Sequence, residues 1–239
     1  MKKSLVGIII PTLVMLVVFG TSKQTIAQKV EIEKRLTEIG ISTDLAFNNL
    51  TENSTEYACN ATMTETTTDK TTIETASFEP RKPEGSRWTL NTVDGGSPSK
   101  KDIKKFNKAH NAKQDNLVAE PDNNSWKIVA DNDHILIIGL QYNEANLPNK
   151  YKFLAKCNAE IYVDKEAKRL YKVKFYNIAP LKIKVFNVVK LDMTVELMPA
   201  EDGKTMLLKD ETIIMDVKML GQLIEITEET EFYDYKKVK

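Results

Sequence analysis

The sequence predicts a mainly β protein of the α+β class, in which a large antiparallel sheet is accompanied by two helices. Three observations lead to this prediction: apolar and polar residues alternate over many short runs, short turns separate those runs, and two segments change to helical spacing. Strands joined by short turns pair antiparallel, because a parallel pair needs a long crossover connection.

The segment ahead of the predicted domain is typical of an exported protein. Two lysines precede an apolar run from Leu5 to Gly20, and small residues follow at Thr25-Ile26-Ala27. These are the three parts of a secretory signal peptide, whereas a membrane-spanning helix needs about 20 apolar residues. We therefore expect residues 1–27 to be a signal peptide cleaved near Ala27 and residues 28–239 to form a single domain. The alternative is that the segment stays as an N-terminal anchor.

Composition is that of a folded, nearly neutral domain. The chain has 34 Lys and Arg residues and 34 Asp and Glu residues, and the predicted signal peptide holds three of the lysines and no acid. The slightly acidic remainder gives no sign of nucleic-acid binding. Hydrophobic residues make up 41% and charged residues 28% of the chain, close to the average of globular proteins. We expect a soluble monomer without a lipid anchor.

The first helical segment runs from Val30 to Asn49. Its apolar residues recur at loosely helical spacing, and Gly40 marks a stop, with a restart at Ser42 or Thr43. A helix here would place one apolar stripe against the sheet.

The second helix should begin after Ser99 and run to about Gln114. The spacing of Ser99 and Asp102 is that of a capping box, and Ile103 and Phe106 then fall on one face, which we expect to be buried. The remaining positions carry six lysines: Lys100, Lys101, Lys104, Lys105, Lys108 and Lys113. Lysines are typical of the wet face of such a helix. The alternative is a contact with an anionic membrane surface or an acidic partner.

Strands are expected over most of the remaining chain. The alternating or continuously apolar runs cover residues 57–63, 126–131, 135–140, 153–163, 171–175, 181–185, 191–197 and 213–219. A threonine-rich stretch, 62–75, alternates in the same way and predicts an exposed hairpin that turns at 68–70. Further tight turns are expected at 164–167 and 200–203.

Two cysteines, Cys59 and Cys157, occupy inward positions of predicted strands. An exported protein can keep a disulfide, but a bridge requires the two Cα atoms to lie within about 7 Å. A disulfide and two buried thiols therefore remain equal alternatives. The two cysteines and the scattered His110 and His134 have no metal-ligand spacing, so we expect no metal site.

Catalytic motifs are lacking in the sequence. It has no nucleophile elbow, no glycine-rich phosphate loop and no zinc-protease histidine pair, so we expect neither an enzyme nor a cofactor. The run Asp131-Asn132-Asp133 could bind a cation, but its place between two apolar runs favours a turn. The pair Glu228-Glu229 could act as acid and base, yet we expect it on a solvated face.

The most distinctive local pattern lies between the threonine-rich hairpin and the second helix. Its fixed positions are Arg87, Trp88, Leu90, Asp94, Gly95 and Pro98. The pattern indicates a short strand, a tight Asp-Gly turn and a helix start, with Trp88 and Leu90 on the same face of a core. It resembles a family of uncharacterised exported bacterial proteins that share this strand, turn and lysine-rich helix, and the weaker likeness extends over roughly residues 57–236. The resemblance implies a periplasmic location.

The order of elements resembles that of the periplasmic carriers of outer-membrane lipoproteins. That resemblance implies a strongly curved antiparallel sheet, an incomplete barrel or half-barrel, around an apolar cavity. The expected inner face carries Met63, Phe153, Ile161, Met193, Val195 and Met215. From it we expect a non-catalytic envelope protein that binds or carries a lipid-like or other apolar ligand, such as an acyl chain. The alternative is a filled core and an interaction or scaffold protein without a small-molecule ligand.

Overall fold

The computed structural model describes residues 26–41, 56–111, 121–147, 149–183, 186–203, 205–219 and 221–238. The helices within these ranges are α1 (Ile26–Ile39), α3 (Lys100–His110), η2 (Glu144–Asn146) and η3 (Asn149–Lys156). The strands are β1 (Tyr57–Thr67), β2 (Lys70–Phe78), β3 (Trp88–Val93), β4 (Lys127–Asp131), β5 (Ile135–Gln141), β6 (Cys157–Asp164), β7 (Arg169–Asn177), β8 (Leu181–Ile183), β9 (Phe186–Pro199), β10 (Met206–Met219) and β11 (Gln222–Lys237). The mainly β, α+β class predicted from the sequence is confirmed.

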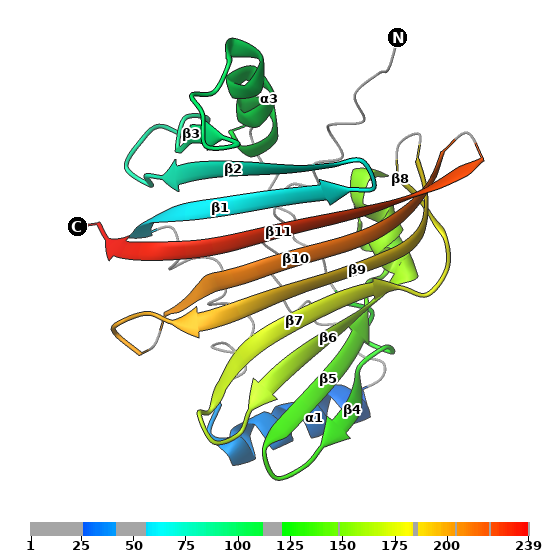
Figure 1. Cartoon of the computed structure of the whole chain (residues 1–239). Coiled ribbons are helices and arrows are strands. Elements are labelled where there is room, and N and C mark those ends of the chain that lie inside the picture. The colour runs from blue at the N-terminus through cyan, green and yellow to red at the C-terminus, as the bar shows by residue number, and fades with distance from the viewer. Residues whose placement is uncertain are drawn as a thin grey trace.

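All the strands belong to one antiparallel sheet of 11 strands (Figure 1). Their order across the sheet is β3-β2-β1-β11-β10-β9-β7-β6-β5-β4, and the short β8 pairs beside β9. The last strand of the chain, β11, therefore lies between β1 and β10 and joins the N-terminal hairpin to the rest of the sheet.

The strong curvature expected of a half-barrel is not seen. β3 and β4 form the two free edges, and the sheet is twisted and open rather than strongly curled (Figure 1). The physical reason lies in how the apolar side chains are grouped. They form a large core under β4 to β10 and smaller clusters near β1, β2 and β3, so the sheet has no single apolar surface to wrap around.

The helix α1 covers the β4 end of the sheet and lies behind β4 and β5 in Figure 1. It buries Ile32 and Leu36 in the main core. The predicted stop at Gly40 is confirmed: its φ of 85° is one that glycine adopts without strain. The amide of Ile41 then donates to the carbonyl of Leu36 over 2.8 Å and completes the cap. The predicted continuation to Asn49 lies outside the described residues.

One strand boundary predicted from the sequence is wrong. Residues 153–156 were expected to extend β6, but they belong to the 3₁₀ helix η3, and the strand begins at Cys157. Alternation placed Phe153 inward, whereas the structure leaves it partly buried and makes Leu154 the fully buried residue, 2% exposed. In a 3₁₀ helix every third residue returns to the same face, so a strand period fails here.

The helix α3 begins with the predicted capping box. The Ser99 side chain accepts from the amide of Asp102, and the Asp102 carboxylate accepts from the amide of Ser99. The helix ends at His110, whereas the sequence suggested about Gln114. Phe106 is buried as expected and packs with Ala76 of β2, but Ile103 is 40% exposed, contrary to the prediction.

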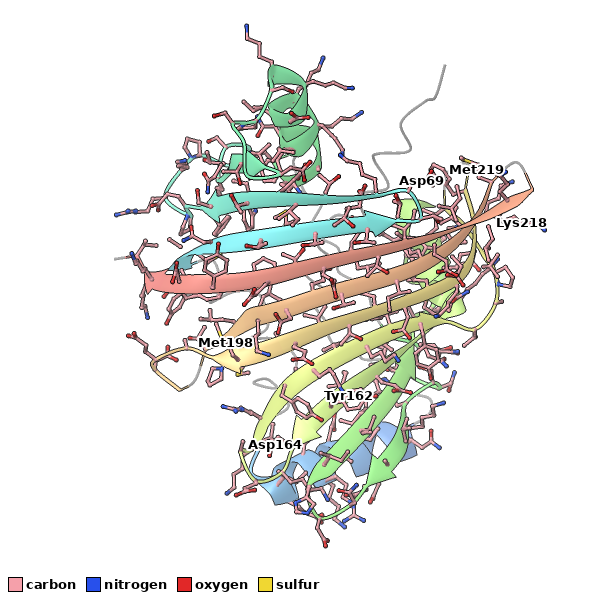
Figure 2. The ribbon with its side chains drawn as sticks, in the orientation of Figure 1. Asp69, Tyr162, Asp164, Met198, Lys218 and Met219 are labelled. Atoms are coloured by element: carbon pink, nitrogen blue, oxygen red, sulfur yellow. The ribbon has the colours of Figure 1, made fainter. Side chains whose placement is uncertain are left out.

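The face of the sheet that α1 and α3 cover is here called the inner face. The opposite, outer face is wet and carries Tyr162, which is labelled on β6 in Figure 2. The predicted tight turns are confirmed at 68–69, marked by Asp69 in Figure 2, at 165–168 and at 200–203.

Candidate functional site

Four adjacent strands each carry one glutamate on the inner face. Glu65 of β1 lies directly opposite Glu228 of β11, and Glu74 of β2 lies opposite Met63, two residues from Glu65. Glu211 of β10 lies opposite a β11 residue two positions from Glu228. Directly opposite Cβ atoms in a sheet are about 5 Å apart, and diagonal neighbours remain within reach of long side chains. The register therefore gathers four carboxyl groups in one patch.

These glutamates line a cavity of about 90 Å³, here called the glutamate cavity. α3 contributes Lys105, Phe106 and His110 to its wall. The remaining lining residues are Met63, Thr64, Thr72, Ile213, Glu229 and Thr230. The cavity therefore combines carboxylates and hydroxyls with a few apolar side chains.

Glu211 is the deepest charged group of the cavity. It is 6% exposed, and its Oε1 atom has no hydrogen-bond partner in the described part of the protein. Its neighbour on β9 is the apolar Val195. Burial raises the pKa of Glu211 to about 7. An unpaired buried carboxyl is unfavourable, and a hydrogen-bond donor placed in the cavity would relieve this cost.

Glu228 is coupled to Glu211, and burial also affects Glu74. Burial, and next the charges of the nearby Glu65 and Glu211, raise the pKa of Glu228 to about 8, while the charge of Lys105 acts to lower it. Burial is also the main cause that raises the pKa of Glu74. Carboxyls that interact in this way titrate as a group rather than one by one. Near neutral pH the pair Glu211 and Glu228 therefore holds protons that ordinary glutamates have lost.

The α3 side of the cavity supplies one cation. His110 is uncharged at neutral pH, because burial, and next the charge of Lys105, lower its pKa to about 4. Its ring stacks on Phe106 with the centroids 4.4 Å apart. Lys105 is then the one positively charged side chain among the lining residues.

The distinctive sequence pattern fixes the position of α3. The amide of Trp88 donates to Oδ1 of Asn111 over 3.0 Å, and Nδ2 of Asn111 donates back to the carbonyl of Trp88 over 2.9 Å. The Trp88 ring also lies 5.2 Å from the ring of Phe78 and 6.0 Å from that of His110. Trp88 therefore supports the α3 wall of the cavity but does not line the cavity itself.

The other positions of the pattern have structural places as well. Leu90 is buried against Phe106. Asp94 and Gly95 have φ values of 50° and 77° and form the predicted turn, where the Asp94 carboxylate accepts from the amide of Ile73 over 2.8 Å. The remaining two positions of the pattern, Arg87 just before β3 and Pro98 just before α3, are partly buried.

The six residues predicted to line an apolar cavity are not all brought together. Ile161, Met193 and Met215 are buried in the main core, and Phe153 and Val195 pack against it. Met63 belongs instead to the smaller clusters beside α3 and lines the glutamate cavity.

Cys59 and Cys157 are both free and buried. They lie on β1 and β6, with four strands between them. At about 4.8 Å per strand step their separation is far beyond the reach of a disulfide, about 7 Å between Cα atoms. Burial raises the pKa of Cys59 to about 11 and that of Cys157 to about 12. Of the two alternatives, the structure has the buried thiols.

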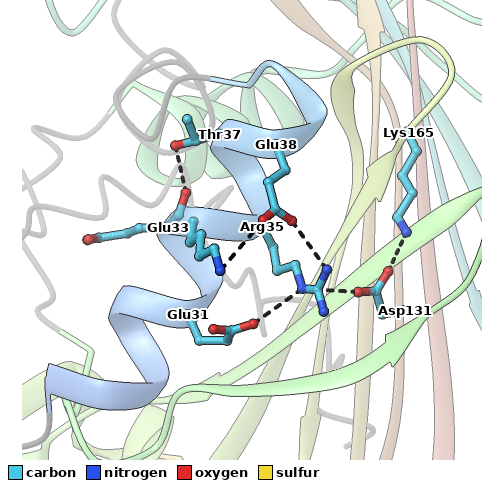
Figure 3. Close-up of polar contacts among 8 residues, drawn as sticks. Glu31, Glu33, Arg35, Thr37, Glu38, Asp131 and Lys165 are labelled. Carbon is cyan, nitrogen blue, oxygen red and sulfur yellow. Dashed lines mark hydrogen bonds and ion pairs between the residues drawn. The ribbon is translucent and has the colours of Figure 1, made fainter.

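The Asp131-Asn132-Asp133 segment is the predicted turn. Oδ1 of Asn132 accepts from the amide of Ile135 over 2.9 Å. Asp131 pairs with Lys165 and lies 3.7 Å from Nε of Arg35 (Figure 3). These contacts tie α1 to the β4–β5 turn and the β6–β7 turn.

The exposed lysines of α3 are not part of the cavity. Lys100, Lys101, Lys104 and Lys108 are exposed, whereas Lys105 is partly buried. Contact between these lysines and an anionic surface remains a prediction.

Comparisons add no relative. No protein family, no curated protein and no solved structure matches the chain. Within the described ranges, no helix is long and apolar enough to cross a membrane. Among the same residues, no group of three or more His, Cys, Asp or Glu is placed to hold a metal ion.

The glutamate cavity was not predicted from the sequence, and the expectation for Glu228 was wrong. Glu228 was expected on a solvated face, but it shares the inward series of β11 with Ile226 and Phe232, and only Glu229 is exposed. Likewise Glu211 shares the inward series of β10 with Ile213. The sequence did hold a signal for the cavity: in each of four strands a glutamate stands at a position that alternation assigns to the same face as the buried apolar residues.

Proposed function

We propose that this chain is a non-catalytic binding protein and that the glutamate cavity is its ligand site. One observation carries this proposal: Glu211 lines the cavity, is 6% exposed, and has a carboxyl oxygen without a hydrogen-bond partner in the described residues. A folded protein keeps such an unfavourable group where the group has a function, and the simplest function here is to accept a hydrogen bond from a bound ligand.

The size of the cavity supports a small ligand. A single water needs roughly 10–15 Å³ measured in the same way, so about 90 Å³ accommodates a small molecule or the head of a larger one. The wall also joins groups from four strands and one helix, which is how binding pockets obtain polar groups in fixed positions.

An apolar ligand under the sheet has less support. Five of the six residues expected to line such a cavity pack in or against the main core, so an acyl chain there would have to displace side chains. The same packing favours the second candidate, an interaction or scaffold protein with a filled core. The two candidates differ in whether the glutamate cavity takes a ligand.

Action outside the cytoplasm is part of the proposal. It rests on the basic start, the apolar run and the small residues before Gln28. Intact-mass measurement of protein purified from cells tests it: loss of the first 27 residues is expected, and a full-length mass would contradict it.

Binding itself is tested by melting the purified protein with four chemically distinct probes: lauric acid, 1,4-diaminobutane, n-butanol and inorganic phosphate. We expect at least one probe to raise the midpoint of the wild type and to lose this effect in Glu211→Gln. Glu225→Gln is the matched control, because Glu225 is exposed on the same sheet and does not line the cavity. Absence of any shift, or equal shifts of Glu211→Gln and the wild type with the probes other than lauric acid, would leave the scaffold candidate in place. A shift with lauric acid that Glu211→Gln retains would instead support the apolar site.

A further inference from the structure

The charges of the glutamate cavity favour a cationic ligand. Five glutamates line the cavity, four on the inner face of β1, β2, β10 and β11 and the exposed Glu229 of β11, and Lys105 is the one ammonium group among the lining residues. Even with Glu211 and Glu228 partly protonated, an anionic ligand would meet repulsion from the remaining carboxylates.

The arrangement favours an organic cation over a bare metal ion. The described residues contain no group of three or more His, Cys, Asp or Glu placed to hold a metal. The four inward glutamates come from four different strands, with Glu65 opposite Glu228 and Glu211 diagonal to it. An ammonium group brings its own N–H donors in several directions and does not need a tight coordination shell.

Apolar side chains define the rest of the ligand. Met63, Phe106 and Ile213 line the same cavity as the glutamates. They offer contact to methylene groups, and methionine adapts its shape to a flexible chain. A polar head among carboxylates and a short apolar body beside these residues describe an aliphatic amine.

We propose that the ligand of the glutamate cavity is a small aliphatic amine whose ammonium group donates hydrogen bonds to Glu211 and Glu228. This proposal rests on the proposed function, since it names the ligand class of the same site. The unpaired Oε1 of Glu211 gains a donor, and the positive charge offsets the repulsion between the two carboxylates.

The proposal includes a proton exchange. The titratable groups that line the cavity with Glu211 are Glu228 and Glu229 from β11, Glu65 from β1, Glu74 from β2, and Lys105 and His110 from α3, while β9 presents the apolar Val195. The amine enters as an ammonium ion and favours the ionised form of the carboxyls. Protons that Glu211 and Glu228 hold near neutral pH therefore pass to the buffer on binding.

Isothermal titration calorimetry tests the ligand class. The probes are n-butylamine and 1,4-diaminobutane, with n-butanol as the neutral analogue and magnesium chloride as the bare cation. We expect both amines to bind the wild type, n-butanol and magnesium to bind at least about tenfold more weakly, and Glu211→Gln to lose at least about tenfold in amine affinity, as expected for one charge-assisted hydrogen bond. Glu225→Gln should bind as the wild type does. Titrations near pH 7 in two buffers of different ionisation enthalpy should show proton release that Glu211→Gln reduces.

Failure of this proposal is distinct from failure of the proposed function. Absence of amine binding to the wild type, or equal binding to Glu211→Gln, overturns the amine assignment. If another probe of the melting panel still depends on Glu211, the cavity remains a ligand site for a different class. Tighter binding of magnesium than of the amines would also overturn the amine assignment. Circular dichroism of Glu211→Gln confirms that the variant is folded, and Glu228→Gln provides a second variant for the same titrations.

Discussion

Replacement of Glu211 by glutamine removes an ionisable group from the glutamate cavity while nearly keeping the size of the side chain. We expect Glu211→Gln to abolish part of the pH dependence of stability, and to make the protein more stable than the wild type at alkaline pH. The reason is that the folded protein holds the proton of Glu211 more tightly than the unfolded chain does.

The magnitude follows from the pKa. Burial raises the pKa of Glu211 from 4.5 to about 7, and each unit corresponds to about 1.4 kcal/mol, so ionisation of this group costs the fold about 3 kcal/mol. Below pH 4.5 both states are protonated and the cost is absent. As the pH rises through about 7 the full cost develops. The wild type should therefore lose about 3 kcal/mol relative to Glu211→Gln between about pH 4.5 and about pH 8.

Other groups also titrate in this pH range, so the stability of Glu211→Gln must be compared with that of the wild type at each pH. The pKa of His110 is lowered to about 4, so its contribution to stability is present above its ordinary value of 6.5 and is lost as the pH falls toward 4. This trend opposes that of Glu211 and is shared by both proteins. Glu228 acts in the same direction as Glu211, and loss of the Glu211 charge also relieves Glu228.

The assay is urea unfolding followed by tryptophan fluorescence at several values between about pH 5 and about pH 8. Glu225→Gln serves as the control for loss of one exposed carboxylate on the same sheet. The assay compares how the free energy of unfolding changes with pH, so any pH-independent difference between glutamate and glutamine cancels. Parallel stability curves for the wild type and Glu211→Gln, within about 0.5 kcal/mol, would refute the assignment of a buried proton to this site.

Two substitutions and one labelling experiment test the support of the cavity, the attachment of α1 and the state of the cysteines. Asn111→Ala removes both hydrogen bonds to the backbone of Trp88, so we expect the free energy of unfolding in urea to fall by about 1–3 kcal/mol and amide exchange in α3 to become faster. Unchanged exchange would show that these two hydrogen bonds do not hold α3 in place. Asp131→Asn should cost less than about 1 kcal/mol in thermal or urea unfolding, since its ion pairs lie at the surface; a larger loss would show that α1 depends on them. Cys59 and Cys157 should resist a thiol reagent until the protein unfolds, because both are buried. Mass spectrometry would count two labels after denaturation without reductant, and the absence of labels would indicate a disulfide.

Alternation along the chain predicted the strands well because each strand has one wet face. It placed Cys59, Ile161 and Met215 inward, and all three are buried. Local chemistry was equally informative: the capping box at Ser99 and the stop at Gly40 depend only on neighbouring residues.

The cavity could not be predicted in this way, for two physical reasons. Charge alone suggests solvent, so Glu228 was expected outside although its phase pointed inward. The neighbours of a strand are also set by the whole fold: Glu65 meets Glu228 only because the first and last strands pair. The curvature of the sheet likewise depends on how side chains group between distant strands, which no local pattern reveals.

The place of β11 in the sheet governs when this site can exist. Glu65 and Glu74 belong to the first hairpin of the chain, whereas Glu228 lies on its last strand, which separates that hairpin from β10. A growing chain therefore has this hairpin without its long-range partner until the final segment has been synthesised. Closing so long a loop is slow, because its entropy is lost before the contacts form. The glutamate cavity is thus complete only once the chain has folded to its last strand, and truncation before Gln222 would remove one wall of the cavity and separate the two ends of the sheet.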